Sequence, residues 1–204
     1  MEKKPFVTKE QLEEIVAALK AGQTIAFPTD TVYGLGVISS DAQALERLKQ
    51  AKGRPENKPV PTMVSSLAQL RMVACVDERT EKIVRAFMPG ALTLVMRRQP
   101  ALPDYMTNGW ETIGVRMPDD PFVLKLIEGC GVPMLVSSAN RSGKATGTTF
   151  AEVMRQLDGR IDGIVKGTCG CLSASTIIDL SGDKVKVLRE GPITSAQIDA
   201  ALNA

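Results

Sequence analysis

Helix-start signals recur along this chain and divide it into short segments. A Ser or Thr followed three residues later by Glu or Gln predicts the first turn of a helix, because the two side chains can bond unpaired backbone N–H groups there. This spacing begins at Thr8, Ser66, Thr149 and Thr194. Further helix starts are predicted at Asp41, Asp77 and Asp120-Pro121. The chain is therefore expected to alternate repeatedly between helices and the segments that separate them.

Short apolar or alternating segments lie between the predicted helices, as is typical of strands. They are residues 24–27, 35–39, 60–64, 92–97, 112–116, 134–137, 176–180 and 185–188. Interleaved helices and strands favour an α/β layered sheet. The last two strands follow each other through a Ser-Gly-Asp turn, so we expect a mixed sheet. No Gly/Ser/Pro-rich linker divides the chain, which predicts a single domain over residues 8–204.

Composition excludes several classes of function. Lys plus Arg number 25 and Asp plus Glu number 23, so the net charge of +2 gives no argument for nucleic acid unless cations cluster locally. The chain has no histidine, which excludes Ser-His and Cys-His nucleophile pairs and imidazole general bases. Its four cysteines show one C-x-C spacing, which favours free thiols over a zinc site or a disulfide framework.

The beginning of the chain carries no apolar signal sequence, because Met1-Glu-Lys-Lys-Pro5 is followed by an amphipathic stretch. No apolar run approaches the length of a membrane span. We therefore expect a cytoplasmic protein that has no membrane partner.

Two loops predict an anion site. Lys52-Gly-Arg-Pro-Glu-Asn-Lys58 places three cations in a loop stiffened by prolines, and Ser137-Ser-Ala-Asn140 ends an apolar strand in hydroxyls and an amide. Arg can bind a phosphate through two parallel hydrogen bonds, and such Ser/Asn loops can direct backbone N–H groups at one. A solvated basic loop and an ordinary helix cap are the simpler alternatives for these segments.

Other polar positions follow strands. Phe27-Pro-Thr-Asp-Thr-Val-Tyr-Gly-Leu-Gly36 is either a polar cluster on a rigid support or a turn between two strands, and spacing alone slightly favours the turn. Thr112 and Arg116 alternate on one strand, so both face the same side. Arg116 is equally consistent with a carboxylate partner within the protein and with an anionic substrate. Arg189, which ends a late strand, is by default a surface arginine.

The order of these motifs carries more information than any one of them. Thr-Asp-Thr-Val-Tyr-Gly-Leu-Gly, Lys-x-Arg-Pro, Pro-Gly-x-x-Thr, Arg-x-Pro, Ser-Ala-Asn-x-Ser-Gly, Ser-Thr-x-x-Asp and Leu-Arg-x-Gly follow one another from about Leu12 to Pro192. In this order the chain resembles the YrdC-like family of threonylcarbamoyl-AMP synthases, in its short single-domain form. The resemblance implies a twisted mixed α/β sheet with flanking helices and a concave basic face.

The resemblance also implies an activity. L-threonine, bicarbonate and ATP with Mg²⁺ would give threonylcarbamoyl-AMP and pyrophosphate, and the product would serve a tRNA-modification complex. Carried over by position, the threonine contacts would be Thr31, Arg116 and Ser175. Lys52 and Arg54 would be catalytic. The ATP contacts would be Arg54, Lys58, Thr112, Ser138, Asn140, Thr146 and Arg189. Asp30 could assist the metal, for which no other protein ligand is expected.

Two positions depart from the family pattern. Many relatives carry a histidine shortly after the basic loop, where this chain has Met63, and Lys58 adds a cation where an amide is common. Two other functions are therefore kept open. The same fold could bind double-stranded RNA or tRNA on its basic face with little synthase activity, although aromatic residues are sparse. A carbamoyl-transfer domain like that of hydrogenase maturation proteins ranks third.

Overall fold

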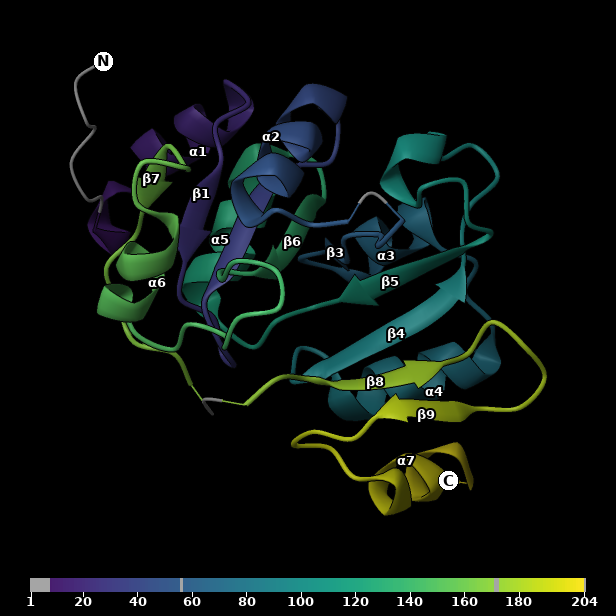
Figure 1. Ribbon diagram of the computed structural model, residues 1–204. Helices are drawn as coiled ribbons and strands as arrows, with labels where there is room; N and C mark the ends of the chain where they lie inside the picture. Colours follow the sequence, from purple (N-terminus) through teal and green to yellow (C-terminus); the bar gives the residue numbers. More distant parts are fainter. Residues whose placement is uncertain (1–7, 56, 171–172, 204) are drawn as a thin grey trace.

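A nine-stranded mixed sheet forms the centre of the computed structural model, which describes residues 8–55, 57–170 and 173–203 (Figure 1). Its strand order is β7-β1-β2-β6-β3-β5-β4-β8-β9. The strands are β1 (Ile25–Phe27), β2 (Gly34–Ile38), β3 (Thr62–Met63), β4 (Leu92–Arg97), β5 (Thr112–Arg116), β6 (Met134–Ser138), β7 (Gly163–Ile164), β8 (Thr176–Asp179) and β9 (Lys186–Arg189).

Helices begin at the predicted signals. They are α1 (Leu12–Lys20), preceded by a short 3-10 turn η1 (Lys9–Gln11), α2 (Ala42–Lys52), α3 (Leu67–Val73), α4 (Glu78–Phe87), α5 (Pro121–Cys130), α6 (Phe150–Leu157) and α7 (Ser195–Asn203). A second 3-10 turn, η2 (Asp104–Met106), was not predicted. Reciprocal capping boxes form at Thr8, Thr149 and Thr194. At the fourth site the Gln69 side chain accepts from the N–H of Ser65 rather than that of Ser66.

The sheet is mixed, as the sequence predicted. The pairs β1/β7, β3/β5 and β4/β8 are parallel, and the remaining neighbours are antiparallel. Strand β3 is shorter than predicted, and Pro61, immediately before it, has no N–H to donate to a ladder. Strand β7 was missed because two residues carry no readable alternation.

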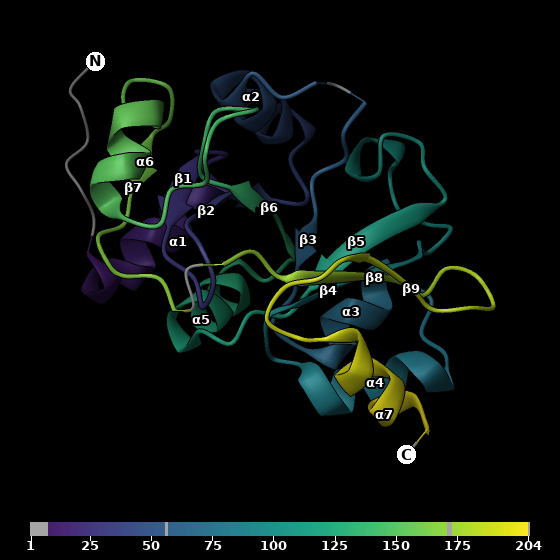
Figure 2. The ribbon, with the colours of Figure 1, turned by 60° about the horizontal axis from the view of Figure 1, so that its bottom comes forward.

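The two halves of the sheet are covered differently, and this difference positions the site. In the half that contains β1, β2 and β6, helices α1 and α5 pack on one face and α2 and α6 on the other. In the other half, α3, α4 and α7 lie together beneath β4, β8 and β9 (Figure 2). Strand β4 accordingly buries Leu92, Leu94 and Met96 in that core and turns Thr93 to the opposite face.

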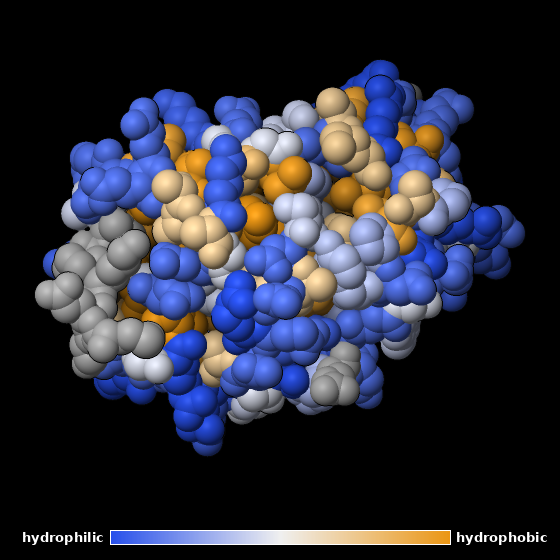
Figure 3. Space-filling view, turned by 90° about the horizontal axis from the view of Figure 1, so that it is seen from above, coloured by the Kyte–Doolittle hydropathy of each residue, from blue (hydrophilic) through white to orange (hydrophobic). Residues whose placement is uncertain are grey.

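The surface carries scattered apolar side chains. On the face drawn in Figure 3, apolar side chains form small patches separated by polar ones. Among the described residues, the large hydrophobic ones that are exposed are Met72, Trp110, Val187 and Leu188. Within the described residues, no helix is both long enough and apolar enough to cross a membrane.

The cysteines in the described part of the chain are free thiols. Cys75 is exposed, Cys130 is buried and Cys169 is half-buried. Cys171 lies outside the described residues, so the prediction for the C-x-C pair stays open. No group of three or more His, Cys, Asp or Glu side chains gathers among the residues that the structure describes.

Core packing on β4 should dominate stability. Leu94→Ala removes a fully buried side chain between the sheet and its helices and should lower the free energy of unfolding by about 3 kcal/mol. Leu188→Ala, on the 57% exposed edge residue of β9, is the matched control and should change it by less than about 0.5 kcal/mol. Urea denaturation measures both, and similar losses would contradict the assignment of the core.

Candidate functional site

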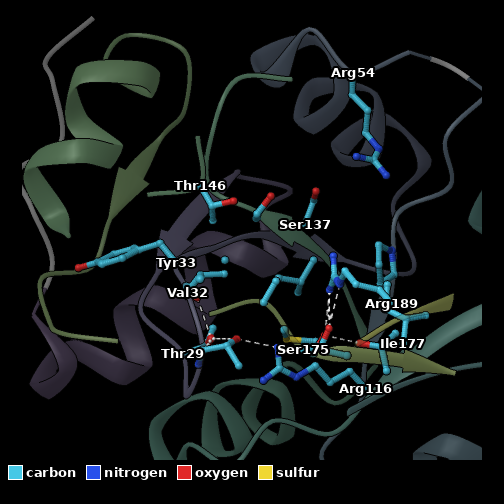
Figure 4. A pocket seen from close by; sticks show the side chains of 18 residues that line it. Thr29, Val32, Tyr33, Arg54, Arg116, Ser137, Thr146, Ser175, Ile177 and Arg189 are labelled. Atoms are coloured by element: carbon cyan, nitrogen blue, oxygen red, sulfur yellow. Dashed lines mark hydrogen bonds between the residues drawn. The ribbon is translucent and has the colours of Figure 1, made fainter. Parts of the chain in front are cut away.

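A cavity of about 300 Å³ opens on the face of β4 and β5 that carries no helix, and it reaches across to the ends of β2 and β6 (Figure 4). Its walls come from segments far apart in the chain. The lining residues are Thr29, Thr31, Val32, Tyr33, Gly34, Arg54, Pro61, Met63, Thr93, Arg116, Val136, Ser137, Ser138, Thr146, Ala174, Ser175, Ile177 and Arg189. The cavity lining therefore combines apolar side chains with hydroxyls and three arginines.

Arg116, at the end of β5, is buried and makes three hydrogen bonds within the protein. Its Nη2 donates to Asp30 Oδ1 at 2.7 Å, its Nη1 donates to Thr31 Oγ1 at 2.8 Å, and its Nε donates to the carbonyl of Gly90 at 3.3 Å. Of the two alternatives that the sequence left equal, the structure shows the carboxylate partner. One carboxylate oxygen of Asp30 is thereby bonded, and its assistance to a metal stays a prediction.

The Thr31 hydroxyl both donates and accepts a hydrogen bond within the protein. Thr29 Oγ1 donates to the carbonyl of Val32, so it can only accept from the Thr31 N–H and from the Thr31 hydroxyl at 3.1 Å. Thr31 thus donates to Thr29 while it accepts from Arg116. One acceptor position of Thr31 Oγ1 remains, so a donor group of a substrate can bind there, whereas an acceptor group would have to displace the bond to Thr29.

A second arginine reaches the cavity from β9. Arg189 Nε and Nη2 donate to the carbonyl of Ser175 at 3.0 and 2.7 Å, and Ser175 Oγ lies 2.8 Å from Thr93 Oγ1. The next turn packs tightly here, because a Cβ on Gly191 would lie 2.5 Å from the carbonyl oxygen of Ala174. Glycine at this position lets the chain after β9 lie against Ser175.

The cationic loop contributes one side chain to the cavity. Arg54 points down into it in Figure 4, while its Nε and Nη2 donate to the carbonyls of Lys58 and Pro59 at 3.1 and 2.7 Å. These bonds to its own loop hold the guanidinium in place. Its remaining N–H groups are available to an anion.

Lys52 is buried and holds the two predicted loops together. Its Nζ donates to the carbonyls of Ser138 and Asn140, the latter at 2.7 Å, and its own carbonyl accepts from the Ser142 N–H at 2.8 Å. Ser138 Oγ in turn donates to Asn140 Oδ1. Lys52 therefore organises the Ser/Asn loop from behind.

Most of the predicted site residues meet at the cavity. Thr31, Arg54, Arg116, Ser138, Thr146, Ser175 and Arg189 line it, and so does Met63. Four predicted residues do not. Lys52 and Asn140 are buried behind the lining, Lys58 is exposed, and Thr112 lies on the same face of β5 as Arg116 but at the opposite end of the strand. The binding roles of all these residues stay predictions.

Several lining residues received no role from the sequence. Thr93 lines the cavity, and in the sequence it entered only as the last residue of the Pro-Gly-x-x-Thr motif. Tyr33 is fully buried and donates to the carbonyls of Val165 and Gly167, which ties the residue before β2 to the segment just after β7. The contact of Thr93 with Ser175 and those of Tyr33 could not be read from local spacing, because each partner lies far away in the chain.

Positive charge exceeds negative charge at this site. Burial lowers the pKa of Arg54, and burial together with the neighbouring Arg116 lowers the pKa of Arg189. Burial, followed by the charge of Arg54, lowers the pKa of Lys52 to about 8. Among the described residues, Arg116 has an acidic partner, whereas Arg54, Arg189 and Lys52 form no salt bridge. The site is therefore suited to an anion.

The comparisons with known proteins agree with this geometry. The model of the family named Sua5_yciO_yrdC, described as "Telomere recombination", matches residues 17–191. A threonylcarbamoyl-AMP synthase of Bacillus subtilis is 39% identical over 94% of this chain, and one of Vibrio cholerae is 38% identical over 89%. The chain spans 56% of the length of the first relative and 98% of the second.

A solved structure is similar throughout the chain. The crystal structure of Pyrococcus abyssi Sua5 complexed with L-threonine superposes with a TM-score of 0.90 at 34% identity. The match covers 97% of this chain and 58% of that one. It confirms the twisted mixed sheet with flanking helices that the sequence predicted.

Removing the carboxylate at the base of the cavity should be costly. Asp30→Asn leaves buried Arg116 without a counter-charge beside Arg189 and should lower the free energy of unfolding by about 3 kcal/mol. Added pyrophosphate should restore more stability to this variant than to the wild type. Urea denaturation with and without the anion checks both points, with exposed Asp199→Asn on α7 as the control.

The buried lysine should give a distinctive pH dependence. Because the pKa of Lys52 is about 8 when folded and near 10.5 when unfolded, the unfolded chain binds the extra proton between these values. Wild-type stability should therefore rise with pH above about pH 8, relative to Lys52→Met. Denaturation curves across this range test it, and Lys125→Met, at an exposed position of α5, is the matched control. Parallel curves for wild type and Lys52→Met would contradict the prediction.

Proposed function

The chain belongs to the Sua5/YciO/YrdC family, and from this premise we propose that it is an L-threonylcarbamoyladenylate synthase. It would combine L-threonine, bicarbonate and ATP into threonylcarbamoyl-AMP and pyrophosphate. The observation that carries the proposal is that Arg54 and Ser138, from two loops far apart in the chain, line the same cavity as Arg116 and Ser175.

The phosphates of ATP would lie on the side formed by Arg54, Ser138 and Thr146. Arg54 is held by its own loop and has no acidic partner among the described residues, so its charge remains available to phosphate. The Ser/Asn loop behind it is fixed by Lys52, which keeps the hydroxyls and backbone N–H groups preorganised. Lys52 and Asn140 would thus support catalysis from outside the cavity.

The amino acid would lie at the opposite side, near Arg116 and Ser175. The resemblance implied an ATP contact for Arg189, but its bonds to the Ser175 carbonyl lead us to assign it to this side instead. Its carboxylate is stabilised by positively charged side chains, whereas its amine needs a free lone pair on nitrogen to react. A Sua5 structure complexed with L-threonine supports this class of substrate. Met63, with Val136 and Ile177, supplies an apolar wall for the side chain.

The reaction then needs positioning more than acid–base groups. Bicarbonate supplies carbon dioxide and hydroxide. The threonine amine adds to the carbon dioxide to form a carbamate, and the proton that it releases joins the hydroxide to give water. A carbamate oxygen attacks the α-phosphate, and the bond to pyrophosphate breaks. Because the carbamate is already an anionic nucleophile, the missing histidine is no obstacle. The protein contributes alignment and the neutralisation of phosphate charge.

We assign Mg²⁺ to the MgATP substrate rather than to a protein site. Asp30 is held by Arg116, and within the described part of the chain no cluster of three acidic, His or Cys side chains is present. ATP phosphates commonly supply most ligands of Mg²⁺. The proposed reaction therefore uses no protein-bound metal.

The product is a mixed anhydride, so it has to be consumed by a group-transfer reaction. We propose that tRNA-modifying partners in the cytoplasm take it up. The alternative, binding of tRNA or double-stranded RNA without synthase activity, predicts affinity that needs no ATP and falls steeply with salt.

Loss of Arg54 should affect the nucleotide more than the amino acid. Arg54→Ala removes a charge-assisted contact to phosphate and should lower kcat/KM by about 30-fold or more, while the affinity for L-threonine alone stays within about twofold. Pyrophosphate release and calorimetric titration measure the two effects.

Arg155→Ala, which removes an exposed guanidinium from α6, is the matched control for Arg54→Ala. If the wild-type chain releases no pyrophosphate when all three substrates are present, the proposed function is wrong. Release that does not depend on bicarbonate would also contradict it.

A further inference from the structure

Thr93 belongs to a row of side chains in register across four strands, with an arginine at each end. It pairs in register with Ile177 of β8, which pairs with Arg189 of β9. The antiparallel register of β4 and β5, continued by one pair beyond Leu94 and Val115, places Thr93 opposite Arg116. Thr93 therefore lies between the two arginines of the amino-acid side.

Ser175 joins this row from the segment just before β8. It precedes Ile177 by two residues, so both face the same side of the sheet. Thr93 is 6% exposed and Ser175 is 5% exposed, and their hydroxyl oxygens are 2.8 Å apart. Two hydroxyl groups in contact bring two protons, and a single hydrogen bond between them uses one.

The second proton has no hydrogen-bond acceptor among the described residues, and the surroundings of Ser175 indicate where it goes. Arg189 Nη2 lies 3.4 Å from Ser175 Oγ and can donate to one of its lone pairs. If Thr93 donates to the other, both acceptor positions of Ser175 are filled, so its own O–H has to point elsewhere. Donation from a cationic neighbour also strengthens that O–H as a donor.

We infer that Thr93 is a positioning residue that turns Ser175 into a dedicated hydrogen-bond donor to the carboxylate of the bound amino acid. The inference rests on the proposed function. A carboxylate between Arg116 and Arg189 presents an acceptor oxygen to Ser175, and this fixes the amino acid by the end that does not react. Thr93 touches the substrate only through Ser175.

Thr93→Val tests the inference, because valine keeps the shape of threonine and removes the hydroxyl. The dissociation constant of L-threonine, measured by calorimetry, should rise about tenfold, and the KM for threonine should rise with it while kcat changes little. The dissociation constant of ATP should stay within about twofold. Thr93→Ser restores the hydroxyl and should bind threonine nearly as the wild type does.

A double variant separates positioning from direct contact. If Thr93 acts through Ser175, Thr93→Val combined with Ser175→Ala should bind threonine no more weakly than Ser175→Ala alone. Losses that add would mean that Thr93 contacts the substrate itself, and this would overturn the assignment. Wild-type affinity in Thr93→Val would overturn it as well.

The matched control is Thr62→Val, the same change at a fully buried strand residue whose hydroxyl has no partner within the described chain. It should leave threonine binding unchanged, and thermal unfolding of all variants shows that they are folded. A wild-type chain that binds ATP but no threonine would overturn both the inference and the proposed function. Threonine binding that is indifferent to Thr93→Val would overturn the inference alone.

Discussion

Positive charge gathered at one cavity, with too little negative charge to balance it, is the constraint on which this site depends. Arg116 has Asp30, but Arg54 and Arg189 are held by backbone carbonyls, and no described carboxylate pairs with them. Carbonyl oxygens fix the direction of a guanidinium without cancelling its charge. The fold thus keeps cations oriented toward a space that an anion can fill. Burial lowers the pKa of both Arg54 and Arg189, and the nearby charge of Arg116 lowers that of Arg189 further.

Lys52 couples this charge to the shape of the site. Its ammonium group, at the end of α2, bonds two carbonyls of the Ser/Asn loop that follows β6. The cationic loop and the hydroxyl loop are therefore parts of one hydrogen-bonded unit. A residue that looks like a phosphate ligand in the sequence acts here as an internal support, and its burial lowers its pKa to about 8. On the opposite wall, Thr93 and Ser175 form a smaller unit of the same kind.

The sequence predicted elements well where their chemistry is local. Three of the four predicted capping boxes form as expected, because a cap involves residues three apart. Strands with a clear apolar face, such as β4 and β5, appear within their predicted bounds. Strand β7 escaped prediction and β3 came out shorter than its predicted range, because two-residue strands exist only through their neighbours in the sheet. The motif order identified the family, and seven of the predicted site residues line one cavity.

The amino-acid sequence by itself determined the α/β alternation, the mixed sheet, the absence of histidine chemistry and the set of polar residues from which a site could be built. Only the tertiary structure decided which of those residues face the cavity. Arg116 pairs with the carboxylate of Asp30, and Lys52 donates to backbone carbonyls behind the cavity lining. Lys58 is exposed, and the Thr93 hydroxyl contacts that of Ser175. Each outcome depends on a partner far away in the chain, and a side chain's burial and hydrogen bonds are set by such partners rather than by its neighbours in sequence.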